Sequence, residues 1–155
     1  MEDRYLYKAK TTPKEKGEFN NVWVTGNLIV SNGKYYIHPV GNVVNVKNEL
    51  GRIIVMHEVI PDTICQCTGL KDKNGNLIWE NDVIHKQFYT DHDAYANSEA
   101  YTGRIQYEYG GWSVEITKSD GSVCVSPIIE MIAYSKDIEH FEVIGNIFDN
   151  PDLLK

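Results

Sequence analysis

The segment HKQFYTDHDAYANSEAY, residues 85–101, holds the densest group of residues that could do chemistry. His85, Asp91, His92 and Asp93 offer imidazole and carboxylate groups, which bind the metal ion of hydrolytic enzymes. Adjacent residues of an extended chain point to opposite sides, so this spacing alone does not bring them to one ion. The segment is also typical of a polar surface loop. We therefore predict no metal-binding or catalytic residue, and we keep a metal-dependent hydrolase as an alternative.

Three cysteines, Cys65, Cys67 and Cys124, form a second group. On a strand, the C-x-C spacing points Cys65 and Cys67 to one face, and Cys124 with a histidine could complete a tetrahedral site. Three cysteines are too few for a disulfide framework, which indicates a reducing compartment. We interpret them as small buried hydrophobic residues.

Sequence motifs of the common enzyme classes are missing. The chain has no G-x-S-x-G, no phosphate-binding P-loop, no G-x-G-x-x-G after a strand and no H-E-x-x-H. His57 and His140 each stand next to a glutamate in a predicted strand, where neighbours face opposite ways. We therefore predict a protein without enzymatic activity and without a cofactor.

The net charge of −7 disfavours a polyanionic partner, because an acidic surface repels nucleic acid unless cations gather on one side. One modest group, KAKTTPKEK, holds Lys8, Lys10, Lys14 and Lys16. Nucleic-acid binding would gain support if these four lysines met Arg104 and Lys118 in one groove between tyrosines. It is the alternative to a protein-interaction role.

Composition indicates a soluble globular protein. Of the 155 residues, 42% are hydrophobic and 24% charged, and no apolar run approaches the length of about 20 residues that a membrane-spanning helix needs. The start, MEDRYLYKAK, does not resemble a secretory signal. We therefore expect a cytoplasmic protein with no membrane partner.

Alternating patterns predict three β-hairpins. In GRIQYEYGGWSVEIT, a Gly110-Gly111 turn puts six apolar residues on a core face, in the pairs Tyr109 with Trp112, Tyr107 with Val114 and Ile105 with Ile116. The other face carries Arg104, Gln106, Glu108, Ser113, Glu115 and Thr117. Because the aromatic residues face the core, this hairpin is not expected to stack bases.

A second hairpin, GNLIVSNGKYYIH, turns at Asn32-Gly33. It pairs Val30 with Tyr35, Ile29 with Tyr36 and Leu28 with Ile37, so both of its faces are apolar. Such a hairpin must be covered on both sides, by the rest of the chain or by another copy of the protein. This is the main indication of self-association.

The third hairpin lies in TGLKDKNGNLIWENDVI, residues 68–84, where an Asn74-Gly75 turn opposes Leu70 to Trp79 and Asp72 to Leu77. Asn81 and Asp82 belong to a second turn, so the polar residues of this segment all have a structural explanation. One helix is expected in SPIIEMIAYSKD, with Ser126 as N-cap and Pro127 at the first helical position.

The segments WVTGNLIV, CTGLKDKNGNLIWENDVI and FEVIGNIFDNPDLL resemble motifs of the YopX-like proteins of phages and prophages. The resemblance covers most of the chain and implies a mainly β protein whose C-terminal part is a small SH3-like barrel. It implies no known biochemical activity and no catalytic residue. The sequence departs from the family pattern at Asn81, where glycine is usual, and at Cys67, where an aromatic residue is usual.

Together these observations give a two-part prediction. Pro61 and Asp62 break the chain, which divides it into an N-terminal β-hairpin subdomain, residues 1–62, and an SH3-like barrel subdomain, residues 63–155. The predicted function is a non-enzymatic module that binds a protein partner or assembles with itself. Nucleic-acid binding by the small barrel is the alternative.

Overall fold

The computed structural model describes residues 5–13, 20–40, 47–48, 51–52, 55–86, 100–117, 121–130 and 140–155. The chain forms two compact units, Met1–Cys67 and Thr68–Lys155. It passes from the first to the second within strand β7 (Cys65–Lys71). The break expected between residues 62 and 63 falls in a short 3-10 helix, η2 (Pro61–Thr63), just before this strand.

The first unit is built on an antiparallel sheet. Its strands, in spatial order, are β6 (His57–Glu58), β3 (Lys34–Pro39), β2 (Trp23–Ser31), β1 (Tyr7–Lys10) and the first residues of β7. Two short strands, β4 (Lys47–Asn48) and β5 (Gly51–Arg52), pair with each other. Ala9, Ile37 and Val59 form the buried core on one face of the sheet.

The hairpin predicted at Asn32-Gly33 is confirmed. Strands β2 and β3 pair Leu28 with Ile37, Ile29 with Tyr36 and Val30 with Tyr35. Asn32 has φ 51° and Gly33 has φ 73°, as a type I′ turn requires.

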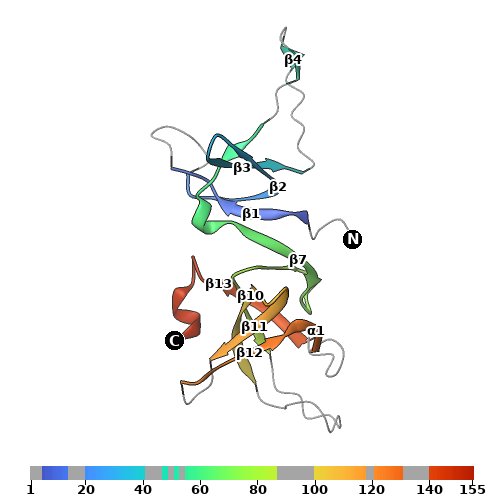
Figure 1. The fold of residues 1–155 in the computed structure, drawn as a ribbon, viewed down its shortest axis with the longest axis vertical. Coiled ribbons are helices and arrows are strands. Elements are labelled where there is room, and N and C mark those ends of the chain that lie inside the picture. Colours follow the sequence, from blue (N-terminus) through green and yellow to red (C-terminus); the bar gives the residue numbers. More distant parts are fainter. Residues whose placement is uncertain are drawn as a thin grey trace. The chain divides into compact units, whose positions relative to one another are not determined.

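The second unit contains a five-stranded antiparallel sheet and a further hairpin. Its strands are β12 (Val123–Pro127), β11 (Gly111–Thr117), β10 (Tyr101–Glu108), β9 (Asp82–Lys86) and β13 (Phe141–Asn146), in that spatial order. Figure 1 shows β10, β11 and β12 side by side. Strand β8 (Leu77–Trp79) pairs with the later residues of β7. The protein is thus mainly β, as expected. Among the described strands no pairing of β12 with β13 closes the sheet into a barrel.

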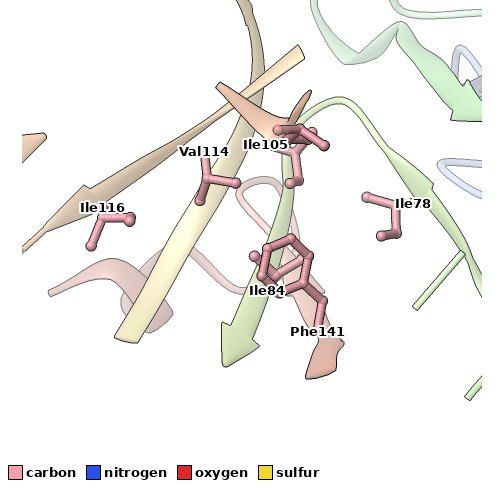
Figure 2. Close-up of a cluster of buried hydrophobic side chains, with 7 residues drawn as sticks. Ile78, Ile84, Ile105, Val114, Ile116 and Phe141 are labelled. Atoms are coloured by element: carbon pink, nitrogen blue, oxygen red, sulfur yellow. The ribbon is translucent and has the colours of Figure 1, made fainter. Parts of the chain in front are cut away.

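One hydrophobic core fills this unit. Its buried members come from four strands of the sheet, from β8 and from α1 (Ile128–Glu130): Ile78, Ile84, Ile105, Val114, Ile116, Ile128 and Phe141. Figure 2 shows Ile84, Ile105, Val114 and Phe141 close to one another although each belongs to a different strand. Burial of this apolar surface is the main term that holds the second unit together.

The register predicted for the β10–β11 hairpin is wrong by two residues. The observed pairs are Tyr107 with Trp112, Ile105 with Val114 and Gly103 with Ile116. The turn is Tyr109-Gly110, both with positive φ, 51° and 83°, instead of Gly110-Gly111. A shift of two residues keeps the paired side chains on their predicted faces, because side chains alternate with a period of two, but it moves Tyr109 out of the strand and into the turn.

Two other predicted boundaries also differ. Between Lys71, the end of β7, and Leu77, the start of β8, the backbone N–H of Asp72 donates to the carbonyl of Asn76 (2.8 Å). This hydrogen bond encloses three residues, 73–75, and not the two residues of the predicted Asn74-Gly75 turn. Ser126 and Pro127 end strand β12, where they pair with Val114 and Ser113, and α1 begins only at Ile128. Pro127 is therefore not the first helical residue.

A short 3-10 helix, η5 (Pro151–Leu154), follows β13. In the part of the chain that the structure describes, no helix has the length and apolar character needed to cross a membrane.

Candidate interaction surfaces

The polar residues of segment 68–84 hydrogen-bond to their own turn and to neighbouring strands. Asp72 is buried, and one carboxylate oxygen accepts hydrogen bonds from the backbone N–H groups of Asn74 (2.9 Å) and Asn76 (2.8 Å). The other accepts from the Asn76 side-chain amide and from the backbone N–H of Val143 (3.2 Å). Burial alone raises the pKa of this carboxyl, but the hydrogen bonds from Val143, Asn76 and Asn74 outweigh it and hold the pKa below its ordinary value.

Residues near Asp72 in the sequence also bind the segment 68–84 to the five-stranded sheet. The backbone N–H of Lys73 donates to the carbonyl of Phe141 (2.8 Å), and the Lys73 ammonium pairs with Glu142 at 2.6 Å. Asp82 accepts a hydrogen bond from the backbone N–H of Trp79 (2.8 Å). Asn81, at φ 65°, donates through its backbone to Ile105 and accepts from Ile147. These polar residues therefore shape turns and join strands.

Two motif glycines have steric roles. A Cβ at Gly26, in WVTGNLIV, would collide with the backbone of His38. A Cβ at Gly145, in FEVIGNI, would collide with Asn150 and would lie 2.8 Å from a methyl group of Leu153. Close packing of backbone against backbone or against η5 explains both glycines without a ligand.

The predicted chemical groups are only partly within the described residues. Asp91, His92 and Asp93 lie outside them, while His85 lies on β9 with its ring nitrogen 3.3 Å from the Thr102 hydroxyl. Among the described residues no three His, Cys, Asp or Glu side chains are placed to hold a metal ion. The metal hypothesis for residues 91–93 therefore stays untested.

No disulfide joins the three cysteines. Cys65 and Cys67 are fully buried on β7, and the Cys65 thiol donates to the carbonyl of Thr63 at 3.4 Å. Cys124 is half-buried on β12 beside the core of the second unit. The interpretation of Cys65 and Cys67 as buried hydrophobic residues fits these positions.

Lys8 and Lys10 meet an aromatic ring on the first sheet. They lie two positions apart on β1 and share the face opposite Ala9. Their ammonium nitrogens lie 5.2 and 5.5 Å from the centroid of the Trp23 ring, within cation–π range. Of the other cations named above, Arg104 lies on β10 in the second unit, and Lys14, Lys16 and Lys118 lie outside the described residues.

On the same face of the first sheet, Glu58 is paired with a lysine and not with a histidine. The Lys34 ammonium lies 3.0 Å from a Glu58 oxygen, and this hydrogen bond raises the pKa of Lys34 above its ordinary value. His57 neighbours Glu58 in the strand but points to the other face.

The β2–β3 hairpin exposes apolar side chains on both faces. Ile29, which pairs with Tyr36, is 36% exposed, and Val30, which pairs with Tyr35 on the opposite face, is 58% exposed. The deeper pair, Leu28 with Ile37, contributes to the core. Toward its turn the hairpin thus has one partly exposed aliphatic side chain on each face, as far as the described residues show.

The turn of the β10–β11 hairpin presents a second exposed group, which we call the aromatic tip: Tyr107, Tyr109 and Trp112. The rings of Tyr107 and Trp112 meet edge to face, with centroids 5.1 Å apart and planes at 76°. Tyr107 is 55% exposed and Tyr109 is 99% exposed, while Trp112 is half-buried against the core. The expectation that all the aromatic residues of this hairpin face the core is therefore wrong for Tyr107 and Tyr109.

The other face of this hairpin, predicted to be exposed to solvent, is partly buried. Gln106 and Ser113, predicted on the outer face, are buried. The side-chain nitrogen of Gln106 and Nε of Arg104 are buried without a hydrogen-bond partner among the described residues.

Sequence reasoning missed the aromatic tip for an identifiable reason. The Gly110-Gly111 pair is a stronger turn signal than Tyr109-Gly110, and both turns place the same residues on the same faces. The run Tyr-Glu-Tyr-Gly-Gly did hold a hint, since the residues beside a tight turn extend past the core.

The family model described as "YopX protein" matches residues 3–155, nearly the whole chain. No curated protein matches the sequence.

Proposed function

The chain belongs to the YopX family, and we propose that it is a non-enzymatic interaction module of phage or prophage origin. The resemblance to YopX-like proteins implies no known biochemical activity. The module acts by binding a protein partner or by assembling with itself inside a host cell. Several of its exposed apolar residues, among them Val30 and Tyr109, lie at or next to hairpin turns, where they can contact another chain.

The observation that carries the proposal is the exposure of the β2–β3 hairpin on both faces. Val30 and Ile29 are large aliphatic residues next to the turn, and they point to opposite sides of the sheet. Contact with a second copy would remove both from water, which is favourable by about 25 cal/mol per Å² of apolar surface. A hairpin inserted between surfaces of another protein would gain the same term.

The mass of the purified protein in solution, measured by light scattering after size exclusion at two salt concentrations, tests self-association. We expect a dimer or larger assembly that persists in high salt, because apolar contacts are not screened. Val30→Lys should shift the mass to that of the monomer. Val123→Lys is a matched control, because Val123 lies on a strand of the other unit and is exposed to the same degree, 59%.

A monomer at all concentrations would exclude self-association and leave the external partner. A wild-type assembly that Val123→Lys dissociates and Val30→Lys does not would move the interface away from the β2–β3 hairpin.

We further propose that the second unit is an SH3-like small barrel. Three features support it: the strands β9 to β12 follow one another as an antiparallel meander, β13 returns beside β9, and one core receives side chains from β9, β10, β11 and β13. A sheet that curls around a single core in this way is close to a barrel. In such a unit α1 stands between the last strands, with Ile128 packed into the core.

Nucleic-acid binding is the second candidate, and the group formed by Lys8, Lys10 and Trp23 favours it. Proteins that bind single strands combine cations with aromatic platforms on an open sheet. The net charge of −7 opposes it. A gel-shift assay with a single-stranded DNA oligonucleotide tests it: binding weakened by Trp23→Ala and by added salt would support this role, and no shift at low salt would exclude it.

A further inference from the structure

The aromatic tip exposes more ring surface than a turn requires. Tyr107 and Tyr109 are exposed, and a side chain added at Gly110 or Gly111 would meet no atom within 4 Å. The described chain therefore leaves the end of this hairpin open. Exposed Tyr and Trp side chains on a rigid hairpin are the residue types that most often anchor protein interfaces.

Tyr109 is also held in an unfavourable backbone conformation. Its φ of 51° lies in the left-handed region, which Gly, Asn and Asp adopt at low cost and a bulky residue does not. The first position of a type I′ turn usually carries Asn or Asp. Since the Tyr109 ring is almost fully exposed, contacts within the described chain do not compensate for this strain. The turn requires this conformation, but it does not require a tyrosine, and a bulky residue kept where Asn would relieve the strain indicates a role in binding.

The charges around the tip indicate the kind of partner. Glu108 follows Tyr107 in the strand and therefore points to the other face of the hairpin, next to the turn, and it takes part in no ion pair among the described residues. Over the whole hairpin, residues 103–117, two glutamates outnumber one arginine. This charge and the total of −7 disfavour a polyanion and favour a basic partner, whose Arg or Lys side chains attract both carboxylates and the faces of aromatic rings.

We propose that the aromatic tip binds a basic, extended segment of a partner protein. Cationic side chains of that segment lie against the rings of Tyr107, Tyr109 and Trp112, and another, reaching past the turn, pairs with Glu108 on the other face of the hairpin. The inference rests on the proposed role as an interaction module, but its residues are separate from those of the β2–β3 hairpin.

The test is a selection from a random dodecapeptide library displayed on phage, with the full chain as bait, followed by fluorescence anisotropy with the labelled winning peptide. We expect enrichment of Arg and Lys. Tyr109→Asn should raise the midpoint of thermal unfolding, because Asn fits the turn, and lower the peptide affinity about tenfold, a loss typical of an anchor residue. Glu108→Gln should also weaken binding and reduce its dependence on salt.

Tyr5→Asn is the matched control, since Tyr5 is an exposed tyrosine of the first unit, and it should leave the affinity unchanged. Failure to enrich any peptide, enrichment of acidic peptides, or full affinity in Tyr109→Asn would overturn the proposal. The proposal would also be overturned if a single-stranded DNA oligonucleotide bound the wild-type protein and bound Tyr109→Asn more weakly. Val30→Lys separates the two proposals, because it should abolish self-association and leave peptide binding intact.

Discussion

The carboxylate of Asp72 and the backbone N–H of Val143 form a hydrogen bond of 3.2 Å between residues 71 positions apart in the chain. The same carboxylate closes the turn through Asn74 and Asn76. One side chain thus shapes a local connection and attaches it to the last strand of the sheet.

Loss of the Asp72 charge should destabilise the second unit. Asp72→Asn keeps the size of the side chain but replaces an acceptor oxygen with a donor that faces backbone N–H groups, so we expect a loss of about 1–3 kcal/mol in the free energy of unfolding. Urea denaturation at neutral pH measures it. Asp152→Asn, at an exposed carboxylate of η5, is the control and should have little effect.

The contribution of Asp72 should also depend on pH. Its folded pKa is lowered, so its stabilisation is complete above the pKa of an aspartate in the unfolded chain, about 3.9, and is lost as the pH falls through the lower folded value. The difference in stability between wild type and Asp72→Asn should therefore shrink below that pH. A difference that stayed constant from neutral to acidic pH would contradict this account.

A methyl group at Gly145 should disturb the packing of η5 on β13. The added carbon would lie 2.8 Å from Leu153, and the cost of such overpacking is about 1–3 kcal/mol. Thermal unfolding of Gly145→Ala measures it. Gly111→Ala is the matched control, because a Cβ there meets open space and the backbone is not left-handed, so its midpoint should stay near that of wild type.

Asn81 should tolerate glycine better than alanine. Its φ of 65° lies in the left-handed region, which costs most residues with a Cβ about 1–2 kcal/mol. Gly adopts this conformation freely, and Asn adopts it more readily than Ala does. Asn81→Ala should therefore lose more stability than Asn81→Gly. Equal losses in both variants would mean that the side chain, and not the backbone, determines this position.

Truncation of Phe141 should be the most damaging of these changes. Phe141 is fully buried and touches the edge of the Tyr101 ring, with centroids 6.5 Å apart, so Phe141→Ala should cost about 3–5 kcal/mol. Ile144→Ala, on the same strand at a position 39% exposed, should cost far less. Denaturant titration of both proteins compares them directly.

Local signals in the sequence predicted part of this fold well. Asn32-Gly33 determined the register of β2 and β3 because few residue pairs suit two successive left-handed positions. Gly110-Gly111 was ambiguous, since two turns fit the same alternation, and the chain uses the one that strains Tyr109. Alternation gives the face of a residue but not its depth, so the exposure of Tyr107 and the burial of Gln106 could not be predicted.

Contacts between residues far apart in the sequence could not be predicted from local sequence patterns. The role of Asp72 as a turn residue followed from its neighbours, but its bond to Val143 depends on how β13 returns to β9. The cation–π group was predictable only in part: Lys8 and Lys10 stood out as a charged run, whereas Trp23 joins them through the pairing of β1 with β2.

The passage of the chain between its two units inside β7 constrains how the protein can be dissected. A fragment that stops before Cys65 removes the neighbour of β1, because Tyr7 and Lys8 pair with Gln66 and Cys65. Its sheet would end in a new, unprotected edge, the feature that promotes aggregation. A fragment with the β2–β3 hairpin and a fragment with the aromatic tip should therefore both retain residues 65–71. Point variants in the intact chain avoid this problem.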